Sequence, residues 1–241
     1  MKAKFNTIFI LLGIFALSLL SACGKSDAKP QEQELGQQPA NDEVEGWYFR
    51  IIYAYPMSLT YEPIVLFKDG QYLEIKDKPL EDIDKVKDKT AHPEAWGTWE
   101  KKGDTFYLSN YAGHVSDYRL GSGSWFPAFP YSAETPLADA YENITGGNYG
   151  NGTHALFKTR IDFPQEGYFY HSSSGAVISP NSSGWNQQKD AGTYSIKDHT
   201  MVLRYNDGQE VRLSFAISAK GTPAKPNAEM LFIGGDVFVA E

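Results

Sequence analysis

Hydrophobic and aromatic residues come in short runs separated by turn sequences that contain glycine, a pattern typical of β-strands joined by hairpins. Residues 47–53 (WYFRIIY) form the first run. Residues 64–67 and 71–75 flank Lys-Asp-Gly, where a tight turn requires a residue with positive φ. Residues 96–100 and 105–108 flank Lys-Lys-Gly-Asp and predict a second hairpin.

The second half of the chain repeats this order. The repeated and additional runs are residues 161–163, 168–170, 191–196, 200–205, 210–217, 230–233 and 237–239. Two diverged copies of one β-meander explain the recurrence. We therefore predict an all-β fold, an antiparallel meander barrel or sandwich spanning residues 45–241. Its halves are about 45–135 and 136–241, and a split into two domains near residue 135 is the alternative.

Two segments interrupt the strand pattern. Residues 79–87 predict one short surface helix, with Pro79 in its first turn. Residues 109–155 are rich in glycine and aromatic residues and give no clean assignment. A loop of this length within a compact domain is either functional or contains undetected elements.

The N-terminus has the pattern of a secretory signal. Lys2 and Lys4 precede an apolar stretch, residues 8–20, which is short for a membrane span of ~20 residues. The stretch ends in Leu20-Ser21-Ala22-Cys23, which resembles the lipobox of bacterial lipoproteins. The resemblance implies that residues 1–22 are a cleaved signal peptide and that Cys23 carries the lipid. An ordinary secretory signal and a transmembrane helix are the alternatives.

The same resemblance implies a cellular location for the protein. In Gram-negative lipoproteins, an aspartate directly after the cysteine usually marks retention in the inner membrane. This sequence has Gly24 at that position, so the lipoprotein would lie in the outer membrane if the cell is Gram-negative. Residues 23–44 comprise the lipidated cysteine and a polar segment that is rich in glutamine and glutamate. Such a composition buries too little apolar surface to fold, so we predict a flexible tether.

Composition narrows the classes of function. The formal net charge is -8, and removal of the two lysines in the signal makes it -8 - 2 = -10. A chain this acidic lacks the basic surface that binds nucleic acid or anionic lipid. The single cysteine excludes an internal disulfide and a cysteine-based zinc site. The remaining partners are the membrane, through the lipid anchor, and an envelope protein or a small apolar ligand.

The body also resembles the lipocalin-like superfamily, whose barrels hold small apolar ligands. Gly97-Thr98-Trp99 matches the Gly-x-Trp motif of that group, although it lies in the middle of the chain. Gly46-Trp47 has the right position near the start of the body but lacks the spacer residue. The hairpins of residues 162–239 are similar to those of uncharacterised bacterial lipoproteins, which have no assigned chemistry.

No catalytic constellation stands out. Gly121-Ser122-Gly123-Ser124-Trp125 is the segment nearest to a nucleophile elbow, but it lacks the strand–turn–helix context. The five histidines have no metal-binding spacing, and we interpret each as a surface residue. The 30 acidic residues single out no carboxylate pair for glycan hydrolysis. We therefore predict a non-enzymatic protein without a metal or cofactor.

One group of aromatic residues lies among the glycines and prolines of the unassigned segment: Tyr111, Tyr118, Trp125, Phe126, Phe129 and Tyr131. These rings either close one end of a barrel or form a binding surface, for which Trp125, Phe126, Phe129 and Tyr131 are the candidates. We predict a ligand- or protein-binding module, and the bulky residues of the inward rows, which tend to fill a small barrel, favour a protein-interaction module with a filled core. The alternatives are a lipocalin-like carrier and a wall-glycan hydrolase.

Overall fold

The computed structural model describes residues 43–54 and 58–241, and all structural statements below concern these residues. Strands form most of this part of the chain, which confirms the prediction of an all-β fold. The signal sequence, Cys23 and the tether up to residue 42 lie outside the described residues.

The first part of the structure is a seven-stranded antiparallel sheet with the strand order β6-β5-β4-β3-β2-β1-β7. Six of its strands form a meander, and β7 returns to pair with β1 through residues 125–127. The strands are β1 Val44–Ala54, β2 Ser58–Phe67, β3 Gln71–Glu74, β4 Trp96–Lys102, β5 Thr105–Asn110, β6 Val115–Arg119 and β7 Trp125–Pro127.

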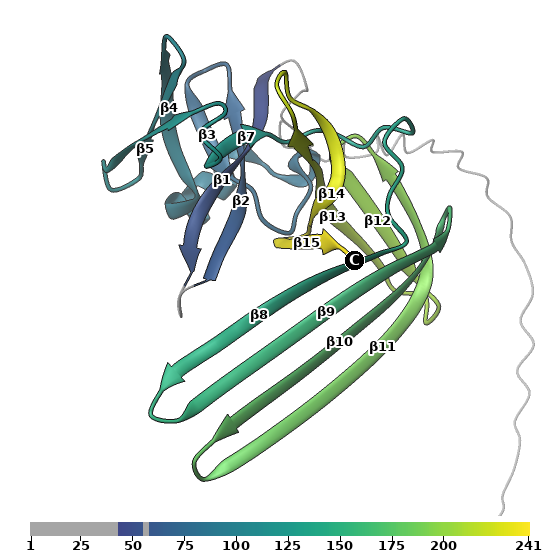
Figure 1. The fold of residues 1–241 in the computed structure, drawn as a ribbon. Helices are drawn as coiled ribbons and strands as arrows, with labels where there is room; N and C mark the ends of the chain where they lie inside the picture. The colour runs from purple at the N-terminus through teal and green to yellow at the C-terminus, as the bar shows by residue number, and fades with distance from the viewer. Residues whose placement is uncertain (1–42, 55–57) are drawn as a thin grey trace, which may run out of the picture. The chain divides into compact units, whose positions relative to one another are not determined.

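The second part is a closed barrel of eight antiparallel strands, in which neighbours along the chain are also neighbours in space (Figure 1). The barrel closes where β15 pairs with β8, through Val239 with Glu142 and Ala240 with Tyr141. The strands are β8 Ala140–Gly150, β9 Thr153–Gln165, β10 Tyr168–Ser179, β11 Ser182–Lys197, β12 Thr200–Tyr205, β13 Glu210–Lys220, β14 Lys225–Ile233 and β15 Asp236–Ala240.

The predicted hairpins are all present, with backbone geometry that explains their turn residues. Gly70 between β2 and β3 has a φ of +80°, and Gly167 between β9 and β10 has a φ of +81°. Asp198 takes the corresponding left-handed conformation between β11 and β12, with a φ of +52°. Aspartate tolerates this conformation better than most side chains do, so the sequence encodes this turn locally as well.

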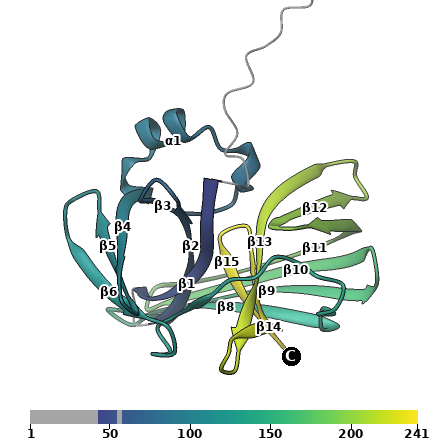
Figure 2. The same ribbon diagram turned by 90° about the horizontal axis from the view of Figure 1, so that it is seen from above.

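The two parts lie on either side of residue 135, the predicted boundary between the two halves. The hairpins that echo each other in sequence are formed by consecutive strands in both parts. Strands β2 to β5 are consecutive neighbours in the first sheet, and β9 to β12 are consecutive neighbours in the barrel. Figure 2 shows the two groups of strands from a second direction. This arrangement agrees with a β-meander built in two parts.

The predicted surface helix is present but begins later than expected. Leu80–Asp82 forms only a 3-10 turn, and α1 covers Lys85–Ala91, followed by a second 3-10 turn, Pro93–Ala95. Asp84 determines the start of α1 because its carboxylate accepts hydrogen bonds from the amides of Val86 and Lys87. No residue of α1 is buried, so the helix lies on the surface as predicted.

Most of the segment that resisted assignment is β structure. It contains β6, β7, β8 and the start of β9. The sequence analysis missed these strands because many of their residues are polar or glycine, so the apolar alternation is weak. Residues 171–190, which form most of β10, the turn after it and the first half of β11, were missed for the same reason.

Three clusters of buried side chains form the core. One cluster lies within the curled first sheet and contains Ile64, Tyr72, Phe106 and Trp125. A second fills the barrel with Tyr141, Ile161, Phe163, Phe169, Met201, Leu203, Phe215, Ile217, Leu231, Ile233 and Phe238. The interior of the barrel is therefore occupied by its own side chains, as the bulky inward rows suggest.

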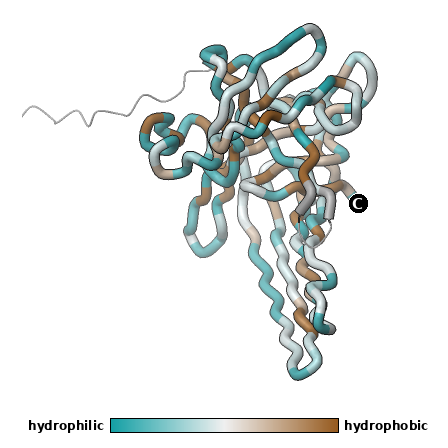
Figure 3. Tube along the Cα trace, turned by 90° about the vertical axis from the view of Figure 1, so that its left-hand side faces the viewer, coloured by the Kyte–Doolittle hydropathy of each residue, from teal (hydrophilic) through white to brown (hydrophobic). Residues whose placement is uncertain are grey.

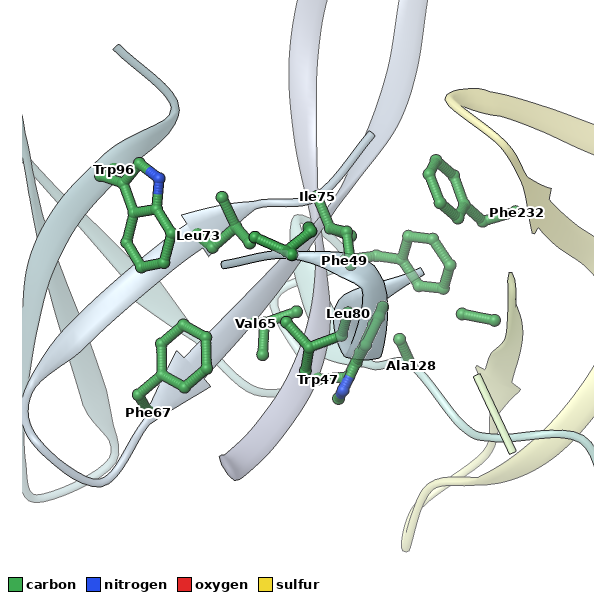
Figure 4. Packing of buried hydrophobic residues seen from close by; sticks show 12 residues of the cluster. Trp47, Phe49, Val65, Phe67, Leu73, Ile75, Leu80, Trp96, Ala128 and Phe232 are labelled. Carbon is green, nitrogen blue, oxygen red and sulfur yellow. The ribbon is translucent and has the colours of Figure 1, made fainter. Parts of the chain in front are cut away.

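The third cluster joins the two parts. Residues of the first sheet, among them Phe49 and Val65, pack with Ala216 of β13 and Phe232 of β14 (Figure 4). Both phenylalanines are at most 1% exposed. Since burial of a phenylalanine side chain contributes about 2 kcal/mol, this cluster fixes the sheet to the barrel.

Candidate functional site

The four aromatic residues predicted as a binding surface do not come together. Trp125 is 0% exposed and lies in the core of the first sheet. Phe126 packs against the shared cluster between sheet and barrel. Phe129 and Tyr131 pack against the barrel core, and the backbone of Phe129 exchanges two hydrogen bonds with Ile217. The described geometry therefore places these rings in three packing environments, with Trp125 out of reach of a partner.

Four strands of the barrel continue beyond its other strands and form a sheet that we call the extension (Figure 1). It consists of residues 143–150 of β8, 153–160 of β9, 171–179 of β10 and 182–191 of β11. Within the described chain, β15 pairs with β8 only up to Glu142, and β12 pairs with β11 only from Gly192 onward. Both edges of the extension are therefore open.

The outer face of the extension carries large apolar side chains that are exposed to solvent. Leu156 lies beside Ala176, and Ala176 lies beside Trp185, so these three form one row across the sheet. Leu156 is 57% exposed and Trp185 is 71% exposed. Ile144 and Ile178, in the adjacent rows of the same face, are also exposed. Apolar segments are visible within the otherwise polar hairpins in Figure 3.

The inner face of the extension continues the face that lines the barrel core. Ile161 points into that core, and every second residue of a strand shares its face. Phe157 and Val177 therefore lie on the inner face, where each is more than a third exposed. Together with Gly175, Gly184 and neighbouring residues they line a shallow hollow of about 450 Å³.

The two open edges differ in regularity. On β8, Gly146 has a φ of +125°, and the pairing with β9 shifts between Asn148 and Gly150. On β11, residues 182–193 pair with β10 without a shift in register. The edge of β11 is therefore a regular strand, whereas that of β8 is irregular.

A second hollow, of about 600 Å³, lies between the first sheet and the barrel and is lined in part by Trp47, Glu81, His199 and Arg212. The rings of Trp47 and His199 stack with centroids 3.9 Å apart. His199 Nδ1 lies 2.9 Å from the carbonyl oxygen of Phe215, so Nδ1 carries the hydrogen. Burial lowers the pKa of His199 to about 4. This histidine is therefore a neutral packing residue, which corrects its interpretation as a surface residue.

Two carboxylates do converge, but an arginine lies between them. Arg50 Nη2 contacts Glu62 Oε2 at 2.6 Å and also pairs with Glu74 Oε1. All three side chains are mostly buried on the inside of the first sheet. Burial, with a smaller contribution from the charge of Glu62, raises the pKa of Glu74. Both acids are engaged by the guanidinium, so the arrangement is that of a buried ion-pair network.

Three further results complete this description. Among residues 43–54 and 58–241, no three His, Cys, Asp or Glu side chains gather in a way that would hold a metal ion. No helix in the described part of the chain has the length and apolar character of a membrane span. Comparison with known proteins adds no relative, because no family model, no curated protein and no solved structure matches this chain.

The extension is the best candidate functional site in the described structure. Exposed apolar patches of this kind mark interaction sites in soluble domains. Sequence reasoning missed it because Leu156-Phe157 and Val177-Ile178 are apolar pairs within polar segments and do not follow the alternation of a half-buried strand. Such pairs, with one residue on each face, are the sequence signal of a strand that exposes both faces.

Proposed function

We propose that this chain is a non-enzymatic lipoprotein of the bacterial envelope that binds another protein through the extension. The observation that supports this most directly is the row of exposed apolar side chains around Trp185. Large aromatic side chains are the anchors that contribute most of the affinity in protein interfaces. A partner that covers Trp185 and Leu156 would remove apolar surface from water on a scale that supports specific binding.

The filled barrel favours a protein partner over a small ligand inside the barrel. A lipocalin-like carrier needs an interior larger than its own side chains fill, whereas here Tyr141, Phe169 and Phe215 are at most 1% exposed. Glycan hydrolysis would need two carboxylates free to act on a sugar, whereas Glu62 and Glu74 are both paired with Arg50. Both alternatives therefore have less support than protein binding.

The lipid anchor is part of the proposal and rests on the sequence alone. Cys23 ends the lipobox-like segment, and 19 residues separate it from Glu43, the first described residue. Two or three acyl chains at about 0.8 kcal/mol per buried methylene would hold the protein stably in the bilayer. The extension would then meet partners of the same envelope or at the cell surface.

Site-specific photocrosslinking in intact cells tests the proposed function. The photoreactive residue p-benzoylphenylalanine replaces Trp185 on the extension and keeps a large aromatic side chain at the anchor position. In a matched control it replaces Val86, which is 77% exposed on α1. We expect a discrete crosslinked protein product from position 185 that is absent from position 86. The absence of a product from position 185, or the same products from both positions, would refute protein binding through the extension.

A further inference from the structure

We define the open edge of β11 as residues 183–190. The hydrogen bonds of neighbouring residues show which of its backbone N–H and C=O groups point away from β10. Ala191 accepts a hydrogen bond from the amide of Asn206, on the side away from β10. Tyr194 donates to Gly167, on the side of β10. Because N–H and C=O of one residue point to the same side of a strand and alternate along it, the odd-numbered residues face outward. The backbone N–H and C=O groups at the open edge therefore belong to Ser183, Trp185, Gln187 and Lys189.

Most of this edge lacks the features that keep strands from pairing with other chains, and its charged residues, Lys189 and Asp190, lie at the end next to the barrel. Proteins block exposed edges with proline, bulges, charged side chains or a covering segment. Residues 183–188 are Ser-Gly-Trp-Asn-Gln-Gln, with neither proline nor charge, and their register with β10 is regular. No strand within the described ranges covers them. An edge with these properties is a template for one more strand.

The hollow on the inner face supplies a place for a side chain of that added strand. Gly184 pairs with Val177, and a Cβ at Gly184 would meet no atom within 4 Å. Phe157 lies across Gly175 and forms an apolar wall of the same hollow. A strand placed alongside β11 would direct every second side chain to this face, and the side chain beside Gly184 would extend over this glycine toward Val177 on β10.

We propose that the open edge of β11 pairs with an extended strand of a different protein, with a bulky apolar side chain of that strand in the hollow beside Gly184. This inference rests on the proposed function and specifies its mode, in which backbone hydrogen bonds provide affinity and the side-chain hollow provides specificity. The outer side of the added strand would cover Trp185.

A second copy of this chain fits the hollow poorly. Two β11 edges that pair antiparallel keep each face of the sheet on its own side. The inner-face residues that a second copy would bring are Ser182, Gly184, Asn186, Gln188 and Asp190. All are polar except glycine, so none fills an apolar hollow. The occupant is therefore a strand of different sequence.

The test introduces second-site variants into the chain that carries p-benzoylphenylalanine at position 185. Gln187→Pro removes one outward N–H without removing a hydrogen bond to β10, a position where an edge strand tolerates proline. Gln187→Ala is the matched control, because it removes the side chain and keeps the N–H. We expect Gln187→Pro to lower the yield of the crosslinked product about tenfold or more relative to Gln187→Ala.

A second pair of variants tests the hollow. Gly184→Val fills it from the inner face, and Ser183→Val adds the same side chain to the outer face of the same strand. We expect only Gly184→Val to abolish the product, while thermal unfolding shows that all four variants fold as the parent protein does. Mass spectrometry of the crosslinked peptide should identify a β-forming segment with a bulky apolar residue.

The other outcomes separate the two proposals. If the product persists in Gln187→Pro and in Gly184→Val, strand addition is wrong and protein binding through the extension stands. If the chain without second-site variants gives no product, both proposals are wrong. A product with twice the mass of this chain would show pairing between copies, and labelling of lipid alone would show membrane contact; either result overturns the proposed partner.

Discussion

The environment of His199 predicts how the stability of the protein depends on pH. Its pKa is about 4 in the folded protein, because burial against Trp47 disfavours the imidazolium, whereas its ordinary value is 6.5. The unfolded chain therefore binds more protons than the folded protein between these two values. Stability contributed by the neutral imidazole is complete above pH 6.5 and is lost as the pH falls toward 4.

The magnitude of the loss follows from the size of the pKa difference. Each unit of pKa difference corresponds to 1.36 kcal/mol, so acidification from pH 7 to pH 5 should lower the free energy of unfolding by about 2 kcal/mol through His199 alone. His199→Phe retains a ring that can stack on Trp47 but cannot take up a proton. The stability of this variant relative to the native sequence should therefore rise by about 2 kcal/mol over the same interval.

Urea denaturation followed by tryptophan fluorescence at pH 7, 6 and 5 measures this difference. The control is Val86→Phe at an exposed position of α1, which changes no titratable group, so its difference from the native sequence should not change with pH. If the difference between the native sequence and His199→Phe is the same at pH 7 and pH 5 to within about 0.5 kcal/mol, the assignment of a buried neutral imidazole is wrong.

Three further predictions concern other parts of the chain. Arg50→Ala leaves Glu62 and Glu74 without their common partner, so chemical denaturation should show a loss of about 3 kcal/mol at pH 7 that shrinks on acidification. Removal of the exposed Lys102, which pairs with Glu100, is the control and should cost much less. Gly97→Ala should lower the free energy of unfolding by about 1–3 kcal/mol, because the added Cβ would overlap Tyr72 and the carbonyl oxygen of Ser109. Gly184→Ala is the control: its added Cβ meets open space, so the free energy of unfolding should stay unchanged. Cys23→Ser should leave the body folded and move the protein from the membrane fraction to the soluble fraction; retention of this variant on membranes after a high-salt wash would contradict the lipid anchor.

The sequence by itself determined the local structure where apolar runs flank clear turn residues. Hairpins such as β2–β3 and β11–β12 follow from apolar runs that flank Gly70 and Asp198, because positive φ at these residues is a property of a few neighbouring positions. The recurrence of these hairpins also indicated a fold in two parts. The start of α1 at Lys85 was missed although its signal is local, since Asp84 is a capping residue of ordinary type.

Only the tertiary structure decided how strands distant in sequence meet. The pairing of β7 with β1, the closure of the barrel through β15 and β8, and the contact of Trp47 with His199 join residues far apart in the chain. Hydrophobic periodicity shows which face of a strand is buried, but it does not specify the neighbouring strand. The open edge of β11 has the same origin, because β12 ends its pairing at Gly192 while β10 and β11 continue, and only the assembled barrel shows which backbone groups remain available for a partner.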